Sequence, residues 1–206
     1  MAMATVSTKN AVGTTVTFPV HLDAASNDVS VASRDTSLPT YSAGGVILVA
    51  NMAASLTDLI VLRGSATKKV RIKKAIVQCG ATTGATVPVY FKRHITANTG
   101  GTAITTPDVV IMDTTSTSAA GTAVPIVYSA NPTIAVTATT IGARNLVTTA
   151  LTTAPGTVEF NPVMDCEQGV VLDGVAAEFA INFGGTTPGA GAVLSWQIVW
   201  TEETQG

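Results

Sequence analysis

The sequence predicts an all-β protein, which we expect to be a jelly-roll-like β-sandwich with an extended N-terminal arm. Hydrophobic residues make up 46% of the 206 residues, whereas charged residues make up only 12%. Ordinary globular chains carry about 25% charged residues, so small polar side chains such as Thr and Ser must form much of the surface, which favours sheets over helices. Short segments of alternating apolar and polar residues, separated by turn residues, favour the same fold class, and no window shows a helical stripe of apolar residues.

The first part of the chain differs from the rest, which predicts a division after residue 55. Residues 1–55 are polar and weakly patterned, and we expect them to form an arm with one or two strands. Val12–Val20 is the clearest of these strands, because its apolar residues recur at even spacing. Asp23–Gly45 is rich in turn residues and ends in a glycine pair. We expect the arm to be held against the β-sandwich domain, residues 56–206, or against a neighbouring subunit.

The β-sandwich domain is expected to contain about eight to ten short strands, a number typical of an all-β sandwich or barrel. One segment, Lys69–Lys73, alternates strictly, with Val70 and Ile72 expected to point inward. The doubled Lys73-Lys74 breaks this alternation, which predicts a β-bulge. The expected strands are Leu59–Arg63, Lys69–Val77, Val87–Phe91, Val109–Met112, Val124–Tyr128, Thr157–Phe160, Gly169–Leu172, Phe179–Phe183 and Leu194–Trp200.

The last expected strand carries the largest apolar side chains of the predicted core. One face of this strand is formed by Leu194, Trp196, Ile198 and Trp200. Large aromatic side chains on a strand face supply much of the buried area of a core. We therefore expect this face to fill the core rather than to stack on a ligand.

We recognise no constellation of catalytic or metal-ligating residues, so we expect neither an enzyme nor a cofactor or metal site. His21 and His94 are the only histidines, and neither has a Cys, Asp or Glu at ligand spacing. Cys79 and Cys166 are the only cysteines, and we expect two buried free thiols rather than a disulfide framework. The sequence Ser65-Ala66-Thr67-Lys68 matches a bare S-x-x-K pattern, but it links two expected strands and lacks the helical context of the catalytic motif.

The charges lie in two opposed blocks, although the net charge is only −2. Residues 61–93 carry eight basic and no acidic residues, whereas residues 94–206 carry one basic and nine acidic residues. Opposed blocks on a rigid body favour contact with another surface. The candidate protein-interface residues are the eight cations of the first block, which we call the basic set: Arg63, Lys68, Lys69, Arg71, Lys73, Lys74, Lys92 and Arg93.

Two other interpretations of the basic set stay open. Its side chains could pair with acidic strands of the same sheet, since opposite charges across strands are mildly stabilising. They could also contact nucleic-acid phosphates. We rank a nucleic-acid contact last, because no aromatic residue interleaves Arg63–Lys74 and the sequence pI is about 5.6.

Four segments of turn and strand residues stand out within residues 57–204. They are Val70-Arg71-Ile72, Phe91-Lys92-Arg93 followed by Thr96–Thr102, Tyr128–Thr133, and Ser195–Glu203. These patterns resemble those of a group of tailed-bacteriophage virion proteins with a β-sandwich fold. The resemblance implies a capsid decoration, or cement, protein that is trimeric and carries an N-terminal arm on the shell. Similar domains in that group also occur in head fibres and tail parts.

A structural virion protein is therefore the leading expectation for the function, and two alternative functions stay open. Its partners would be capsid or other virion proteins and further copies of the chain, and it would be made in the host cytoplasm, because the start of the sequence shows no export signal. The first rival is a tail, neck or head-fibre component that binds a receptor or glycan through exposed aromatic residues. The second is a hydrolase that uses His94 as its general base. We expect no membrane span, because the longest uncharged stretch, residues 114–143, holds prolines and many threonines.

Overall fold

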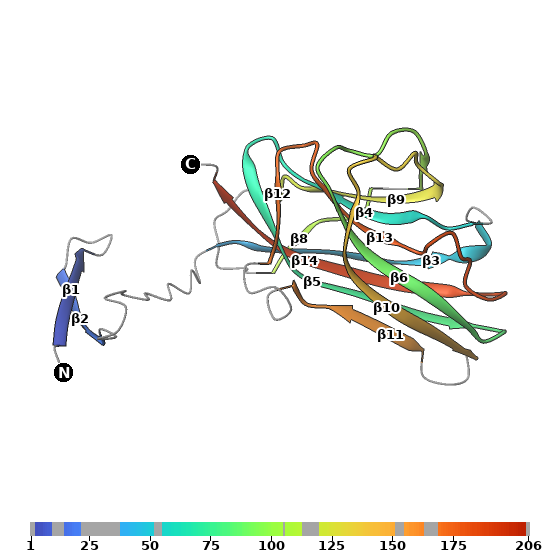
Figure 1. Ribbon diagram of the computed structural model, residues 1–206, viewed down its shortest axis with the longest axis horizontal. Helices are drawn as coiled ribbons and strands as arrows, with labels where there is room; N and C mark the ends of the chain where they lie inside the picture. Colours follow the sequence, from blue (N-terminus) through green and yellow to red (C-terminus); the bar gives the residue numbers. More distant parts are fainter. Residues whose placement is uncertain are drawn as a thin grey trace. The chain divides into compact units, whose positions relative to one another are not determined.

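The structure, a computed structural model, describes residues 3–9, 15–21, 38–51, 55–104, 106–112, 120–150, 155–162 and 169–204. Cys166 lies outside these residues. The chain divides into two compact units, Met1–Ser37 and Leu38–Gly206. In the first unit, β1 (Met3–Lys9) and β2 (Thr15–His21) form a two-stranded antiparallel sheet. The second unit, which we call the body, contains all the other described strands (Figure 1).

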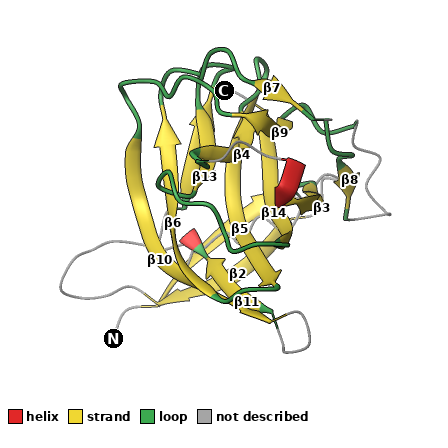
Figure 2. Cartoon of the chain, turned by 90° about the vertical axis from the view of Figure 1, so that its right-hand side faces the viewer, coloured by secondary structure: helices red, strands yellow, loops and turns green. Residues whose placement is uncertain are grey.

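The first sheet of the body is built around two long antiparallel strands, β5 and β14 (Figure 2). β14 pairs on its other side with β3, and β8 pairs with the start of β3. The free side of β5 pairs with β12 and then with β11. The bounds of these strands are Thr40–Leu48 (β3), Lys68–Ala81 (β5), Val110–Ile111 (β8), Gly156–Phe160 (β11), Val170–Asp173 (β12) and Val193–Thr204 (β14).

The second sheet has the strand order β7-β9-β4-β13-β6-β10, and all its neighbours are antiparallel. Thr149 and Ala150 at the end of β10 also pair, in parallel, with Gly80 and Ala81 of β5, which joins the two sheets. A short 3-10 helix, Val49–Asn51, follows β3. The fold is therefore all-β with two antiparallel sheets, as the sequence predicts. The bounds are Asp58–Arg63 (β4), Ala85–His94 (β6), Thr102–Ala103 (β7), Val124–Ala130 (β9), Thr139–Ala150 (β10) and Glu178–Asn182 (β13).

Side chains from both sheets form the main hydrophobic core. Phe91 of β6 and Phe179 of β13 belong to the second sheet, and their rings stack with that of Phe160 in the first sheet. The ring centroids of the closest pair, Phe91 and Phe160, are 4.6 Å apart. Such aromatic pairs contribute beyond the apolar area that they bury. The expected core face of the last strand is confirmed, because exposure is between 0% and 4% for Leu194, Trp196, Ile198 and Trp200.

The predicted β-bulge is confirmed at Lys73. Trp200 of β14 lies opposite Ile72, whereas the preceding residue of β14 lies opposite Lys74, so Lys73 is the extra residue. A bulge shifts the alternation of a strand by one residue. This shift lets Ile72 and Ala75, which are separated by an odd spacing, both lie buried in the core.

The boundary between the two units falls earlier in the chain than the sequence indicated. We expected the β-sandwich domain to begin at residue 56, whereas β3 pairs with β14 along its whole length, within the first sheet of the body. The glycine pair Gly44-Gly45, which suggested a turn, lies inside this strand. A Cβ atom on Gly44 would lie 2.7 Å from the carbonyl oxygen of Trp196. A close approach of two strand backbones therefore explains the glycine at this position.

Candidate interaction surface

The fold divides the basic set between the two sheets. Arg63 ends β4, and Lys92 and Arg93 lie near the end of β6, so these three residues belong to the second sheet. The other five members lie on β5 of the first sheet. Residues that form one continuous block of positive charge in the sequence are thus split over two sheets.

Three members of the basic set form ion pairs with acids of the opposite charge block. Each pair joins neighbouring strands, β4 to β13, β5 to β14 and β5 to β11. The three pairs are Arg63–Glu178 (2.6 Å), Arg71–Glu203 (2.9 Å) and Lys74–Glu159 (3.0 Å). This arrangement is the cross-strand pairing that the sequence left open as an alternative.

Other members of the basic set also have neighbours within the fold. Nζ of Lys68 donates a hydrogen bond to the hydroxyl of Thr204 (3.2 Å). The ammonium group of Lys92 lies 6.0 Å from the ring centroid of Tyr90, at the limit of a cation–π contact. Only Arg93 of the set is exposed, and the others are half-buried. The basic set therefore stays a predicted contact surface, with three of its eight charges already paired to acids of the chain.

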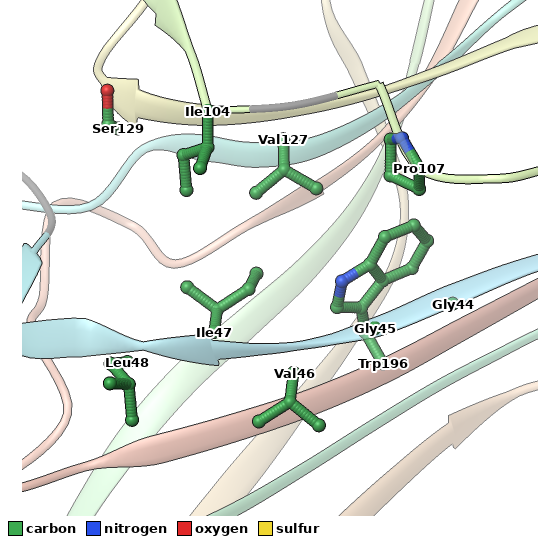
Figure 3. A pocket seen from close by; sticks show the side chains of 10 residues that line it. All are labelled: Gly44, Gly45, Val46, Ile47, Leu48, Ile104, Pro107, Val127, Ser129 and Trp196. Atoms are coloured by element: carbon green, nitrogen blue, oxygen red, sulfur yellow. The ribbon is translucent and has the colours of Figure 1, made fainter.

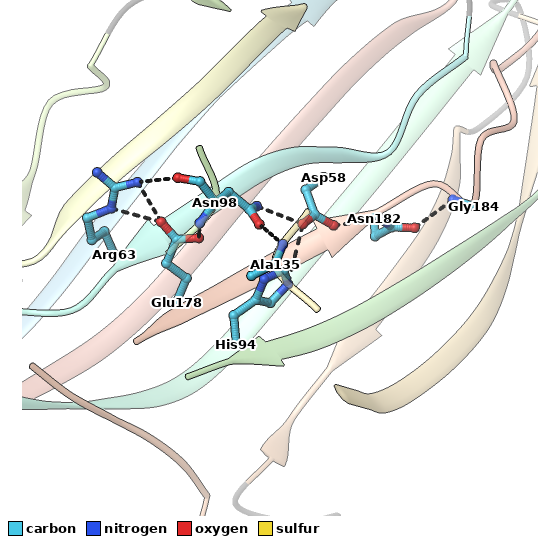
Figure 4. Close-up of polar contacts among 8 residues, drawn as sticks. All are labelled: Asp58, Arg63, His94, Asn98, Ala135, Glu178, Asn182 and Gly184. Atoms are coloured by element: carbon cyan, nitrogen blue, oxygen red, sulfur yellow. Dashed lines mark hydrogen bonds and ion pairs between the residues drawn. The ribbon is translucent and has the colours of Figure 1, made fainter. Parts of the chain in front are cut away.

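A second group of polar residues is enclosed by the fold, and we call it the buried polar cluster (Figure 4). Asp58 accepts hydrogen bonds from the side-chain amides of Asn98 (2.8 Å) and Asn182 (2.6 Å). Glu178 accepts hydrogen bonds from the backbone N–H of Asn98 (2.9 Å) and from the guanidinium of Arg63. Exposure is at most 5% for the members of the cluster, which are Asp58, His94, Asn98, Glu178 and Asn182.

Asn98 makes this cluster a clamp for two loops. Its side-chain oxygen accepts a hydrogen bond from the backbone N–H of Ala135 (3.1 Å). One residue further along, Thr99 and Thr133 exchange two backbone hydrogen bonds. The loops that follow β6 and β9 are thereby fixed to each other and to the carboxylates of β4 and β13. Burial, together with the charge of Glu178, also raises the pKa of Tyr128 beside the cluster.

His94 lies in the buried polar cluster, where it has no contact with solvent. Its side chain and that of Asp58 are both 0% exposed, and Nε2 of His94 lies 3.3 Å from Oδ2 of Asp58. Neither ring nitrogen completes a hydrogen bond, so the contact is close but poorly aligned. A general base must lie within hydrogen-bond distance of the proton that it removes from a substrate. The structure gives a substrate no access to His94, and the other histidine, His21, lies in β2 of the first unit.

Glu202 anchors a further buried network at the end of β14. Its side chain accepts hydrogen bonds from the backbone N–H groups of Thr122 and Ala123 and from Nε1 of Trp200, at 2.9 to 3.0 Å. Burial, and to a lesser extent the charge of Glu202, raises the pKa of Tyr41. A buried carboxylate is stable only when it is hydrogen-bonded. This network therefore attaches the segment before β9 to β14, and its role is structural.

An apolar groove of about 450 Å³ lies between the edges of the two sheets (Figure 3). Ile47 of β3 and Trp196 of β14 form one side of it. The other side is formed by Val127 of β9 and by Ile104 and Pro107, which follow β7. None of the described residues that line the groove is charged.

β3 forms one rim of the groove and carries exposed apolar side chains on its opposite face. Val46 is 70% exposed and Leu48 is 55% exposed, and both point away from the groove (Figure 3). β3 contains no charged residue and no proline, although such residues commonly protect edge strands from pairing with another chain. We call Ala43–Leu48 the β3 edge.

Neither the buried polar cluster nor the β3 edge was predicted from the sequence. Asp58 and Asn98 are 40 residues apart, and Asn98 and Glu178 are 80 residues apart, so no local spacing could reveal the cluster. The β3 edge was hidden because its glycine pair suggested a turn. Its available signal was the uncharged apolar run Val46–Leu48.

Further observations concern metals, membranes and aromatic side chains. Within the described ranges, no group of three or more metal-ligating side chains occurs. No helix among the described residues is long and apolar enough to cross a bilayer. Of the described aromatic side chains, all except Tyr90 are buried. Comparison with protein-family models, curated proteins and solved structures finds no match.

Proposed function

We propose that the chain is a structural virion protein without enzymatic activity, which decorates a capsid shell as a cement protein. The observation that carries the proposal is the strand order of the body, which contains β3-β14-β5-β11 in one sheet and β4-β13-β6-β10 in the other. This order supports a jelly-roll-like β-sandwich, because strands distant in sequence alternate within each sheet. Viral capsid domains and lectins use double-sheet jelly rolls. The patterns within residues 57–204 that resemble phage virion proteins support the same proposal.

The proposed mechanism is multivalent binding to the shell. Many copies that each make modest contacts with neighbouring shell subunits gain strength through effective concentration. Residues 1–37 are proposed to be the N-terminal arm that attaches to the shell. The basic set is proposed to orient docking on an acidic shell surface, with exposed Arg93 as its best-placed member. The chain would act in the virion and contact no membrane.

Deletion of residues 1–37 tests the proposed arm without cutting the body, because β3 begins at Thr40. We expect the 38–206 chain to keep the circular dichroism spectrum of the body but to leave capsids unoccupied in a sedimentation assay. Full occupancy by the truncated chain would refute the role of the arm. The copy number in purified particles, counted by quantitative mass spectrometry, tests decoration itself. On the order of hundreds of copies supports decoration, whereas a dozen or fewer would refute it.

The alternative is a tail, neck or head-fibre component that binds a receptor or glycan. The strand order is compatible with this alternative, because lectin domains also use jelly rolls. The burial of the described aromatic side chains other than Tyr90 speaks against a stacking platform for sugars. Adsorption of the purified chain to host cells would favour the alternative, and the absence of adsorption would remove it.

A further inference from the structure

The β3 edge presents backbone groups whose directions follow from three hydrogen bonds. On the outer side of β3, the carbonyl of Thr40 accepts a hydrogen bond from the N–H of Met112 (2.8 Å). On the side of β14, the carbonyl of Pro39 accepts a hydrogen bond from the backbone N–H of Glu202. The backbone N–H of Val49 donates one to the carbonyl of Ala192. Successive residues of a strand direct their N–H and C=O groups to opposite sides. The outward-directed groups of the β3 edge are therefore those of Gly44, Val46 and Leu48.

These outward groups have no strand beside them in the described part of the chain. β8 covers the outer side of β3 at Tyr41 and Ser42 only. A row of unpaired N–H and C=O groups on a strand without charge or proline is a template for strand addition. A strand that adds to this edge would come from another chain or from a segment outside the described residues, and the self-complementarity of the edge favours a second copy of the chain.

We propose that a second copy of this chain covers the β3 edge, by antiparallel pairing of the two β3 strands about a two-fold axis at Val46. In this register, Val46 faces Val46 of the partner subunit, and Gly44 faces Leu48 of the partner subunit. All the outward-directed residues then form hydrogen-bonded pairs, with about six hydrogen bonds in total. Slipping by two residues would bring Leu48 against the segment that β8 covers, or Gly44 against the 3-10 helix after β3.

The side chains fit the same register. Residues directly opposite each other in an antiparallel pair project to the same face of the sheet. On the outer face, Leu48 therefore packs over Gly44 of the partner subunit. On the face of the groove, Ile47 packs beside Gly45 of the partner subunit. Each large side chain meets a glycine, and the exposed side chain of Val46 meets its own symmetry mate, which makes the edge self-complementary.

The interface has a defined stoichiometry. A two-fold interface uses the same patch on both subunits and closes at two copies. Pairing of two β3 edges would thus give a dimer, whereas the resemblance to virion proteins implied a trimer. It does not rest on the proposed function, because the purified chain alone is sufficient to measure it.

The first experiment measures mass in solution by sedimentation equilibrium. The intact chain is expected at about twice its chain mass of 20.9 kDa. Val46→Lys places two like charges opposite each other and should raise the dissociation constant by about 100-fold or more. The matched control is Val147→Lys, because Val147 is another exposed strand valine (53%) and lies in β10 of the second sheet. This control should leave the dimer unchanged.

The second experiment tests the register by disulfide formation, in a chain whose native cysteines are replaced by alanine. Val46→Cys should give a covalent dimer with diamide as the oxidant, because the Cα atoms of a hydrogen-bonded pair lie about 5.5 Å apart, within disulfide range. Leu48→Cys should not, because the two copies of residue 48 would be separated by about 13 Å along the strands.

Each outcome decides for or against the proposal. A dimer that Val46→Lys dissociates and Val46→Cys cross-links supports it. A monomeric intact chain, or a dimer that Val46→Lys leaves intact, would overturn it. Cross-linking through Leu48→Cys in place of Val46→Cys would overturn the register, and with it the complementarity on which the proposal depends.

Discussion

Asp58 provides the sharpest test of the buried polar cluster, through the substitution Asp58→Ala. Its carboxylate is 0% exposed and accepts hydrogen bonds from the amides of Asn98 and Asn182. Alanine would leave both amides buried without these acceptors. Each unsatisfied buried group costs about 1–3 kcal/mol, so we expect the free energy of unfolding to fall by about 4 kcal/mol. A loss of that size is a large share of the stability of a domain, which is about 5–15 kcal/mol.

Urea denaturation followed by tryptophan fluorescence measures this loss. Asp108→Ala, a change of an exposed aspartate, is the control and should stay within about 0.5 kcal/mol of the wild type. Asp58→Asn keeps one acceptor and should cost about half as much as alanine. In a double-mutant cycle, Asp58→Ala and Asn98→Ala should show a coupling energy of about 1 kcal/mol or more. A decrease in the free energy of unfolding below about 1 kcal/mol for Asp58→Ala, or strict additivity in the cycle, would refute the proposed role of the buried polar cluster in holding the two loops together.

Two further predictions concern the core. Phe160→Ala should lower the free energy of unfolding by about 3–5 kcal/mol, because the ring of Phe160 stacks on Phe91 of the other sheet. A urea midpoint equal to that of the wild type would show that the packing of the two sheets does not depend on this contact. Burial raises the pKa of the Cys79 thiol from 9.0 to about 11. Between pH 9 and 11 the folded chain therefore keeps a thiol proton that the unfolded chain loses, so the free energy of unfolding should fall as the pH rises through this range. Relative to Cys79→Ala, the wild type should lose about 2 kcal/mol over this range, and parallel pH profiles of the two chains in urea unfolding would contradict the shift.

The fold could be predicted where strand patterns are strong and local. β5 and β14 alternate clearly, and even the bulge at Lys73 was visible as a break in that alternation. β10 was missed, because Gly142, Arg144 and Asn145 interrupt its apolar residues. Between Thr139 and Thr148, where burial is described, its buried positions are Leu146 and Thr148. Tertiary pairing with β6 makes this segment a strand, although its own propensity does not.

The candidate surfaces could be predicted less well, for two physical reasons. The cations of the basic set were visible in the sequence, but their partners Glu178 and Glu203 lie more than 100 residues away, and only folding brings them together. The β3 edge was hard to predict because glycine signals both turns and close strand approaches. Which of the two applies at Gly44 depends on the carbonyl of Trp196, a residue in a different part of the chain.

The ion pairs of the basic set and the exposure of the β3 edge change which of these two surfaces is expected to drive association. The ion pairs Arg71–Glu203 and Lys74–Glu159 already satisfy part of the basic set, and partly exposed charges are weakened by screening in salt. Strand addition at the β3 edge depends instead on backbone hydrogen bonds and on apolar area around Val46, neither of which salt screens. The charge asymmetry that dominates the sequence is therefore partly used inside the fold. The uncharged β3 edge, which the sequence hardly marks, has backbone groups that no described strand pairs.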